Sequence, residues 1–290
     1  MNTRITPLRY PGGKQKITPF IKEIIQNNNL DGCSYIEPYA GGAGVALSLL
    51  VNNIVNNIYI NDISKNIYAF WYSVINDTER FVLKIRDIPL NIEEWGKQHS
   101  IFKSNTDNLF DLGFATFFMN RCNRSGILTG GVIGGKAQSG KWKLDARFNK
   151  QDLIKRIECI GAYRDRIHLF NDDAVVFLKN LHLNDNAIIY LDPPYFNKAD
   201  SLYENYYKNE DHEKIARYLN MYESKPWIIS YDYTKEISQL YKNNESFTYS
   251  LQYNAAKAYK GTEFFSFSRE LNIPENSSLD FINQGLRNRR

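Results

Sequence analysis

The chain has 290 residues, of which 43% are hydrophobic and 23% are charged, and this length allows one large α/β domain with an insertion. Its longest apolar runs, such as Ala187 to Leu191, are too short to cross a bilayer, and its first residues show no secretory signal, so we expect a cytoplasmic protein without membrane contact. Three widely spaced cysteines, Cys33, Cys122 and Cys159, predict neither disulfides nor a metal site.

Positive charge is concentrated in the middle of the chain. Residues 80–170 hold 16 Lys and Arg against 9 Asp and Glu, although the formal net charge of the whole chain is only +4. Such a basic block favours a surface that faces a polyanion, and an ordinary solvated face is the alternative.

The first predicted unit is a strand, a glycine turn and a helix. The stretch CSYIEPYAGGAGVALSLLV predicts a strand over residues 34–37 and a helix that opens near Gly44. The stretch NNIYINDISKNIYAFWYSVI predicts a second unit, with a strand over 58–61, an acidic turn at Asp62 and a helix from about Ser64. Two neighbouring units of this kind are typical of a nucleotide-binding sheet.

The sequence pattern changes between residues 77 and 163. Periodic segments such as LFDLGFATFFMNRC predict helices, whereas NRSGILTGGVIGGKAQSGKWKLDARFN is basic, rich in glycine and typical of loops. We therefore expect an inserted, mostly helical module in this region.

Strand character returns over residues 166–171, 187–192 and 227–232, and the later stretch YSLQYNAAKAYKGTEFFSFS alternates like an antiparallel pair. Alternating strands and helices predict a mostly parallel sheet that is covered on both faces, which gives a Rossmann-like α/β fold. The expected division is a catalytic domain of residues 1–76 and 164–270, an insertion of residues 77–163 and a C-terminal tail of residues 271–290.

The glycine turn and the acid that follows it indicate a nucleoside site. In EPYAGGAG, Gly41 and Gly44 allow a tight turn close to a ligand, and Asp62 ends the next strand, where a carboxylate accepts ribose hydroxyls. The spacing of the glycines differs from the dinucleotide-binding pattern G-x-G-x-x-G, and Glu37 would repel a pyrophosphate. A nucleoside without phosphates therefore fits better. The alternative is a glycine turn that only packs the helix on the strand. S-adenosylmethionine is such a ligand, and Glu37 and Asp192 would suit its cationic methionine part.

The stretch IIYLDPPYFN leads an apolar strand into an acid, two prolines and an aromatic residue. The strand places Asp192 at the carboxyl edge of the sheet, where open α/β folds bind their ligands. Pro193 and Pro194 fix the backbone and hold the carbonyl between them outward as an acceptor, and Tyr195 adds an aromatic plate. Two acceptors beside a ring predict a receptor for a flat group with an NH₂, such as adenine or cytosine, and a rigid strand-end turn is the alternative.

This arrangement also predicts a type of catalysis. Hydrogen bonds from the amine to Asp192 and to the Pro193 carbonyl would localise the lone pair of the amine and aim it at a sulfonium methyl. No covalent enzyme intermediate is needed. Because none of the three cysteines follows a proline, a ring-carbon cytosine methylase, which needs a cysteine nucleophile, is disfavoured.

These residues resemble the D12 class of DNA adenine-N6 methyltransferases, the Dam-like enzymes. The similarity runs from Leu8 to about Phe267 and rests on LRYPGGKQKI, EPYAGGAG, INDIS, NRSGI, LDPPYF and the late KGTE. It implies transfer of a methyl group from S-adenosylmethionine to the N6 amine of adenine in a short, specific sequence of double-stranded DNA. The base would be flipped out of the duplex into the pocket at D-P-P-Y.

The resemblance also implies roles for individual residues. Asp192, Pro193, Pro194 and Tyr195 match the catalytic motif, in which the tyrosine stacks on the target base. Asp172 matches the residue at the cofactor adenine, with Asp173 as an equal alternative. The residues that match cofactor contacts are Tyr10, Lys14, Glu37, Tyr39, Gly41, Gly44, Asp62, Asp172 and Asp192.

The basic middle block corresponds to the family's target-recognition insertion. Its R-x-N-R-x-G segment and the adjoining Gly-rich stretch suit phosphates and base edges, and solvated loop charges are the alternative. The residues expected at the DNA are Arg121, Asn123, Arg124, Ser125, Lys136, Lys141, Lys143 and Arg147.

Three other functions stay open at this point. A cytosine-N4 methyltransferase uses the same amine chemistry, a catalytically silent DNA-binding protein would keep the fold without turnover, and RNA would be an alternative substrate. The resemblance over most of the chain favours the adenine-specific DNA enzyme. A restriction nuclease encoded elsewhere would be a compatible partner, and a monomer is the expected state.

Overall fold

In this computed structural model, β-strands form one sheet in the order β3-β2-β1-β4-β5-β7-β6-β8. The residues that the structure describes are 5–9, 13–104, 106–182, 186–196, 207–221, 225–254, 258–274 and 287–288. The strands are β1 (Ser34–Glu37), β2 (Asn57–Asn61), β3 (Ile167–Phe170), β4 (Ala187–Leu191), β5 (Trp227–Asp232), β6 (Ser246–Asn254), β7 (Ala258–Phe267) and β8 (Arg287–Asn288).

The direction of the strands fixes where a ligand would bind. Strands β3, β2, β1, β4 and β5 are parallel, and β7 runs antiparallel between β5 and β6. The chain moves outward from β1 to β3 and then returns to place β4 on the other side of β1, so the strand order reverses between these two strands. Ligands of open α/β sheets bind beyond the carboxyl ends of the strands at such a reversal. Glu37 ends β1 and Asp192 follows β4, so the two sequence motifs meet there.

The sheet is covered on both faces, as the central strand β4 shows. Ile188 and Tyr190 belong to a core that includes residues of α1, α2 and α3, whereas Ile189 and Leu191 belong to a second core with residues of α8, α10 and α11. Each fully buried aliphatic side chain of this kind contributes about 1.5–3 kcal/mol. The helices are α1 (Thr18–Asn27), α2 (Gly44–Val51), α3 (Lys65–Asn76), α8 (Ala174–Asn180), α10 (Asn209–Met221) and α11 (Lys235–Leu240).

Polar residues mark where several of these helices begin. The Ser64 hydroxyl accepts a hydrogen bond from the third residue beyond it at the start of α3, and the Asp173 carboxylate accepts from two backbone N–H groups at the start of α8. Asn108 and Asn149 cap two helices of the insertion in the same way. Caps of this kind stabilise a helix by about 1 kcal/mol each, so the loop-to-helix transitions are encoded locally.

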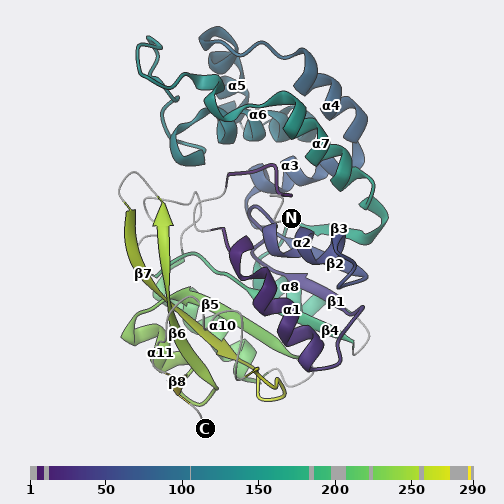
Figure 1. The fold of residues 1–290 in the computed structure, drawn as a ribbon, viewed down its shortest axis with the longest axis vertical. Helices are drawn as coiled ribbons and strands as arrows, with labels where there is room; N and C mark the ends of the chain where they lie inside the picture. Colours follow the sequence, from purple (N-terminus) through teal and green to yellow (C-terminus); the bar gives the residue numbers. More distant parts are fainter. Residues whose placement is uncertain are drawn as a thin grey trace.

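The insertion is helical and shares its core with the sheet domain. Phe70 of α3 stacks on Phe117 of α6, with 6.0 Å between the ring centroids. A Cβ added at Gly113 would lie 2.2 Å from the Ala69 carbonyl oxygen, so α6 approaches α3 so closely that only glycine fits. Figure 1 shows α3 between the sheet and the helices gathered at the far end of the molecule. These helices are α4 (Thr78–Asp87), α5 (Ile92–Ser104), α6 (Leu109–Cys122) and α7 (Lys150–Gly161).

The structure confirms the expected fold class, a Rossmann-like α/β sheet with a mostly helical insertion. The strands predicted over residues 34–37 and 227–232 are found with those bounds, and the strand predicted over 166–171 is one residue shorter at each end. The division into domains remains a prediction, because one hydrophobic core runs from the sheet into the insertion. Within the described residues, no helix combines the length and apolar character needed to span a membrane.

Candidate active site

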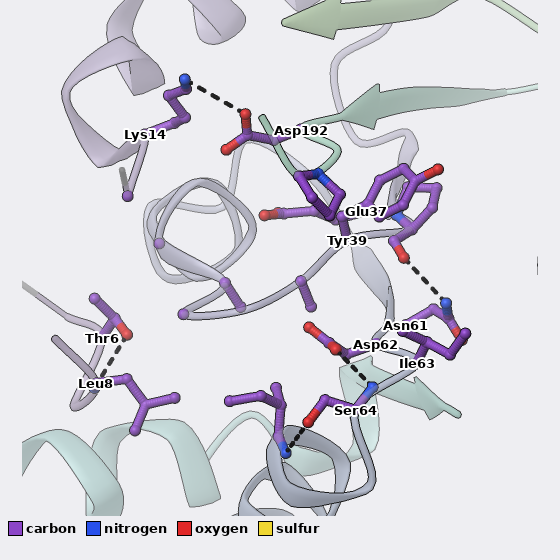
Figure 2. A pocket seen from close by; sticks show the side chains of 18 of the residues that line it. Thr6, Leu8, Lys14, Glu37, Tyr39, Asn61, Asp62, Ile63, Ser64 and Asp192 are labelled. Carbon is purple, nitrogen blue, oxygen red and sulfur yellow. Dashed lines mark hydrogen bonds and ion pairs between the residues drawn. The ribbon is translucent and has the colours of Figure 1, made fainter. Parts of the chain in front are cut away.

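Lys14 lies in a buried cluster with residues that are far from it in the sequence. Its Nζ is 2.7 Å from Glu263 Oε2 and 3.4 Å from Asp192 Oδ1. The Tyr195 hydroxyl lies 3.5 Å from the same Nζ and donates a hydrogen bond to Glu263 Oε1 at 3.2 Å. Figure 2 shows Lys14 and Asp192, which both line the cavity, pointing toward each other. The ammonium group of Lys14 therefore joins the D-P-P-Y motif to strand β7.

The charges in this cluster are coupled. Burial alone would lower the pKa of Lys14, but the carboxylates of Asp192 and Glu263 raise it well above its usual value, so the ammonium stays charged. Burial raises the pKa of Asp192 and the pKa of Glu263, and Lys14 opposes both shifts. Two carboxyl groups therefore share one ammonium group.

One oxygen of Asp192 is held and the other is available to a ligand. Oδ1 accepts a hydrogen bond from Ser230 Oγ at 3.1 Å in addition to its contact with Lys14. Because the single hydroxyl hydrogen of Ser230 is used in this bond, the Tyr190 hydroxyl, 2.8 Å from Ser230 Oγ, must be the donor to Ser230. Among the described residues, Oδ2 accepts no hydrogen bond, and 22% of the Asp192 side chain is exposed.

The rest of the D-P-P-Y motif is packed into the same edge of the sheet. Pro193 is buried and Pro194 lines the cavity. Tyr195 is only 5% exposed, with Lys14 Nζ 5.2 Å from its ring centroid. Stacking of a base on this ring therefore requires a local rearrangement that uncovers it.

Asp62 fixes the glycine turn. Its Oδ2 accepts a hydrogen bond from Gly41 N at 2.8 Å, and its Oδ1 accepts from Ser64 N at 2.9 Å. Gly41 has φ = 44°, in the left-handed region that glycine adopts without strain. Trp71 of α3 donates from Nε1 to the Gly41 carbonyl oxygen at 2.9 Å, so both backbone groups of this glycine are held.

Asn61 connects three strand ends beneath the cavity. Its side-chain Nδ2 donates to the carbonyl oxygens of Pro38 and Asp172 at 3.0 and 2.9 Å, and its Oδ1 accepts from Asp172 N at 2.9 Å. The side chain is fully buried. Asn61 therefore sets the position of Asp172 relative to the glycine turn.

Glu37 is a buried carboxylate at the opening of helix α2. It is 5% exposed, and its Oε2 accepts a hydrogen bond from Ala46 N at 3.2 Å. Burial, followed by the nearby charge of Asp192, raises its pKa well above the usual value. A cationic ligand between the two carboxylates would relieve this repulsion.

A cavity of about 670 Å³ joins these groups. Tyr39 and Tyr207 contact each other at its edge, with 2.8 Å between the two hydroxyl oxygens. Gly41 supports the turn without lining the cavity, and Tyr10 lies outside the described residues. The predicted cofactor residues that line the cavity are Lys14, Glu37, Tyr39, Gly44, Asp62, Asp172 and Asp192, and Figure 2 shows several of them.

Two residues expected at the DNA are instead inside the protein. Arg121 is 8% exposed, and its guanidinium donates to the carbonyl oxygens of Pro7 and Arg147. Asn123 is fully buried; its Oδ1 accepts from Trp95 Nε1 at 2.9 Å and its Nδ2 donates to the Leu128 carbonyl oxygen at 2.8 Å. In this structure neither side chain is available to a DNA surface, because their polar groups organise the insertion.

The other residues expected at the DNA lie at the surface. Ser125 has φ = 57°, so the short helix that begins at Arg124 contains an abrupt turn of the backbone. Gln138 braces the Gly-rich stretch by donating to the carbonyl oxygens of Ile133 and Gly135 at 2.8 and 2.6 Å. The exposed residues are Arg124, Ser125, Lys136, Lys141, Lys143 and Arg147.

Sequence reasoning missed three residues of the site: Glu263, Ser230 and Asn61. Glu263 belongs to the KGTE stretch, and a charged residue inside an apolar alternating strand was a signal of a buried ion pair. Asn61 precedes the predicted ribose acid and offered a weaker signal. Ser230 carried no signal in the sequence, because a serine in a strand is commonplace.

Comparisons with known proteins indicate the family of the chain. The family model of D12 class N6 adenine-specific DNA methyltransferases matches residues 10–257. The Type II methyltransferase M.MjaIII of Methanocaldococcus jannaschii is 25% identical over 230 residues, which cover 73% of this chain and 78% of that protein.

Two solved structures overlay on most of the chain at low similarity. PH1948 from Pyrococcus horikoshii has a TM-score of 0.44 and 10% identity over 90% of this chain and 86% of that chain. The rRNA methyltransferase AviRa from Streptomyces viridochromogenes has a TM-score of 0.35 and 10% identity over the same shares.

A mostly parallel sheet with an acidic cavity at the point where its strand order reverses is the architecture in which open α/β proteins bind their ligands. Since the family model covers most of the sequence, the chain belongs to the D12 class of N6 adenine-specific DNA methyltransferases. The resemblance seen in the sequence motifs is thereby confirmed.

Proposed function

We propose that this chain transfers a methyl group from S-adenosylmethionine to the N6 amine of adenine in double-stranded DNA. The reaction would take place in the cavity between Glu37 and Asp192. The observation that carries the proposal is the state of Asp192, whose Oδ1 is fixed by Lys14 and Ser230 while its Oδ2 is left for a ligand.

The residues present suit this methyl donor. Glu37 is a buried carboxylate with a raised pKa near Asp192, which favours a cationic amino-acid part. Asp62 and Asp172 lie on the same cavity, where carboxylates would accept ribose and adenine donors. When bound, S-adenosylmethionine supplies a methyl group that its sulfonium already activates.

Asp192 and the backbone of Pro193 orient the target amine. Asp192 Oδ2 would accept one amine hydrogen and the Pro193 carbonyl the other, so that the amine lone pair points at the methyl group. Lys14 and Ser230 keep the carboxylate from rotating, and Glu263 keeps Lys14 in place. These residues act through orientation and charge without forming a covalent intermediate.

The target adenine must leave the duplex to reach Asp192, at a cost of a few kcal/mol. Stacking on an uncovered Tyr195 would recover about 1–3 kcal/mol. The exposed basic residues, among them Arg124 and Lys141, would hold the DNA backbone. A restriction nuclease encoded elsewhere is the partner that a Type II methyltransferase relative suggests.

The test is a nucleoside assay. The protein is expressed in a host without adenine methylation, and the purified protein is also incubated with S-adenosylmethionine and unmethylated plasmid. Genomic DNA, plasmid DNA and total cellular RNA are then digested and analysed by mass spectrometry. N6-methyladenine supports the proposal. N4-methylcytosine alone, modification of RNA alone, or DNA binding without any methylated base would contradict it and select the corresponding alternative.

A further inference from the structure

The cavity has a second wall that belongs to the insertion. Thr6 and Leu8 of the N-terminal segment line it together with Asn120 and the loop of residues 126–129. In Figure 1 the purple N-terminal segment runs between the insertion and the sheet. The segment that leads to Lys14 is therefore in contact with both parts of the molecule.

The side chain of Asn120 in helix α6 forms hydrogen bonds with the backbone of Arg9. Its Oδ1 accepts from Arg9 N at 2.7 Å, and its Nδ2 donates to the carbonyl oxygens of Arg9 and Gly126 at 3.2 and 2.9 Å. The side chain is 1% exposed. Its acceptor and both of its amide hydrogens are thus used to join two backbone segments.

Two arginines of the insertion hold the residues just before Arg9. Arg121 NH1 donates to the Pro7 carbonyl oxygen at 3.3 Å, and Arg156 NH1 donates to the Thr6 carbonyl oxygen at 2.9 Å. Hydrogen bonds from a charged donor are stronger than neutral ones, about 1.5–3 kcal/mol in typical cases. The insertion therefore holds the backbone of this segment through several independent contacts.

Gly126 and Asn123 complete this arrangement. Gly126 has φ = +78°, and a Cβ placed on it would lie 2.1 Å from the Arg9 carbonyl oxygen. Arg9 NH1 donates to the Asn123 carbonyl oxygen at 3.1 Å. The R-x-N-R-x-G segment, four of whose residues were expected at the DNA, thus has a buried part that contacts residues 6–9.

We propose that Asn120 and Gly126 are positioning residues that hold residues 6–9 and thereby keep Lys14 at Asp192. Arg124 and Ser125 lie at the surface between Asn123 and Gly126. DNA bound there would therefore affect the same contacts with the backbone of Arg9. The insertion would in this way couple target recognition to the catalytic carboxylate. This inference rests on the proposed methyl transfer for its kinetic consequences.

The test compares Asn120→Ala and Gly126→Ala with Arg124→Ala and with Asn76→Ala, an exposed asparagine of α3 that serves as the matched control. Folding is checked by circular dichroism and thermal unfolding, and Arg156→Met offers a milder variant if the first two do not fold. Single-turnover methylation is measured at saturating DNA and S-adenosylmethionine over a range of pH. DNA affinity is measured at several salt concentrations. Lysine acetylation read by mass spectrometry reports the exposure of Lys14, with exposed Lys97 as the internal standard.

If the inference holds, Asn120→Ala and Gly126→Ala lower the single-turnover rate by about 10- to 100-fold, and Lys14 becomes reactive toward acetylation. The fall of the rate at low pH begins at a higher pH than in wild type, because Asp192 loses the nearby charge of Lys14. DNA affinity and its salt dependence stay at wild-type values. Arg124→Ala instead weakens DNA binding and lowers its salt dependence. The acetylation result does not depend on activity, so an inactive wild-type protein would refute the proposed function alone. The inference is overturned if, in both variants, Lys14 stays protected from acetylation and the single-turnover rate stays near that of wild type. It is also overturned if both variants lose DNA affinity as Arg124→Ala does.

Discussion

Lys14 and Glu263 form a buried ion pair, with 2.7 Å between Nζ and Oε2, although one lies near the start of the chain and the other in strand β7. Their side chains are 2% and 1% exposed. The same ammonium contacts Asp192, and the same Glu263 carboxylate accepts from Tyr195. Asp192 and Tyr195 of the D-P-P-Y motif are therefore held by two residues that lie far from the motif in the sequence.

Glu263→Gln should impair both folding stability and catalysis. The substitution keeps the shape but removes a buried negative charge beside Lys14, so the free energy of unfolding should fall by about 1–3 kcal/mol. Turnover should also fall, because Lys14 and Tyr195 lose their common anchor. Thermal unfolding and single-turnover methylation test the two effects.

The matched control is Glu93→Gln, which breaks the exposed ion pair with Lys97 on α5. Surface pairs of this kind contribute little to stability, so this variant should keep the melting temperature and activity of the wild type. Equal behaviour of the two variants would contradict the anchoring role of Glu263.

Asp192→Ala should abolish methyl transfer and leave the protein folded. The residue follows a strand and is partly exposed, so little packing is lost, while the acceptor that orients the amine disappears. Loss of such an orienting group lowers turnover by at least about 10²-fold. Methylation of unmethylated plasmid is measured beside Asp165→Ala, an exposed acid outside the cavity. A variant that keeps about a tenth of wild-type turnover would refute the mechanism.

Much of the site could be predicted because many of its residues lie in short contiguous sequence motifs. The apolar run before Asp192 and the glycines after Glu37 placed two groups at strand ends, and parallel pairing brings such ends together. Lys14 was expected at the cofactor, but its contacts with Asp192 and Glu263 were not predicted. The contact with Glu263 depends on the antiparallel pairing of strand β7 with β5. Long-range contacts of this kind leave no periodic trace in a sequence.

The insertion shows the limit of reading charge as function. Arg121 and Arg124 belong to one motif and have the same side chain, yet the first is buried against backbone carbonyls and the second is exposed. Helix α6 is buried on nearly all sides, so hydrophobic periodicity gave no indication of which of its polar residues face inward. Only the packing of α6 on α3 and on the N-terminal segment decides this.

The rate should depend on pH through Asp192. Its carboxylate must be ionised to accept the amine hydrogen, and burial raises its pKa above the ordinary aspartate value. Turnover at saturating substrates should therefore fall as the pH decreases through this raised pKa. Lys14→Met removes the charge that opposes the shift, so the pKa of Asp192 rises further and the acid limb should move to higher pH. A limb that stays in place or moves to lower pH would contradict the contact between the two groups.

Glu37→Gln should weaken binding of the methyl donor. The buried carboxylate loses its charge but keeps its size, so the attraction for a cationic amino-acid part is lost while the cavity keeps its shape. We expect the dissociation constant of S-adenosylmethionine to rise by about tenfold, which corresponds to about 1.4 kcal/mol. Calorimetric titration measures it, and Glu79→Gln on α4 is the surface control. Unchanged affinity in Glu37→Gln would place the cationic group elsewhere.

DNA binding should weaken with salt, and the exposed lysines of the Gly-rich stretch should carry part of this dependence. Each lysine that contacts a phosphate releases counterions, so Lys136→Ala or Lys141→Ala should reduce the slope of log affinity against log salt by about 1. Fluorescence anisotropy with a duplex that the protein methylates measures the slope at several salt concentrations. Lys97→Ala removes an exposed lysine from α5 and should leave the slope unchanged if DNA lies along the Gly-rich stretch. Because contacts to phosphates carry no sequence information, the two lysine variants should weaken binding to specific and nonspecific duplexes alike. A loss confined to the specific duplex would instead mean that these lysines read bases.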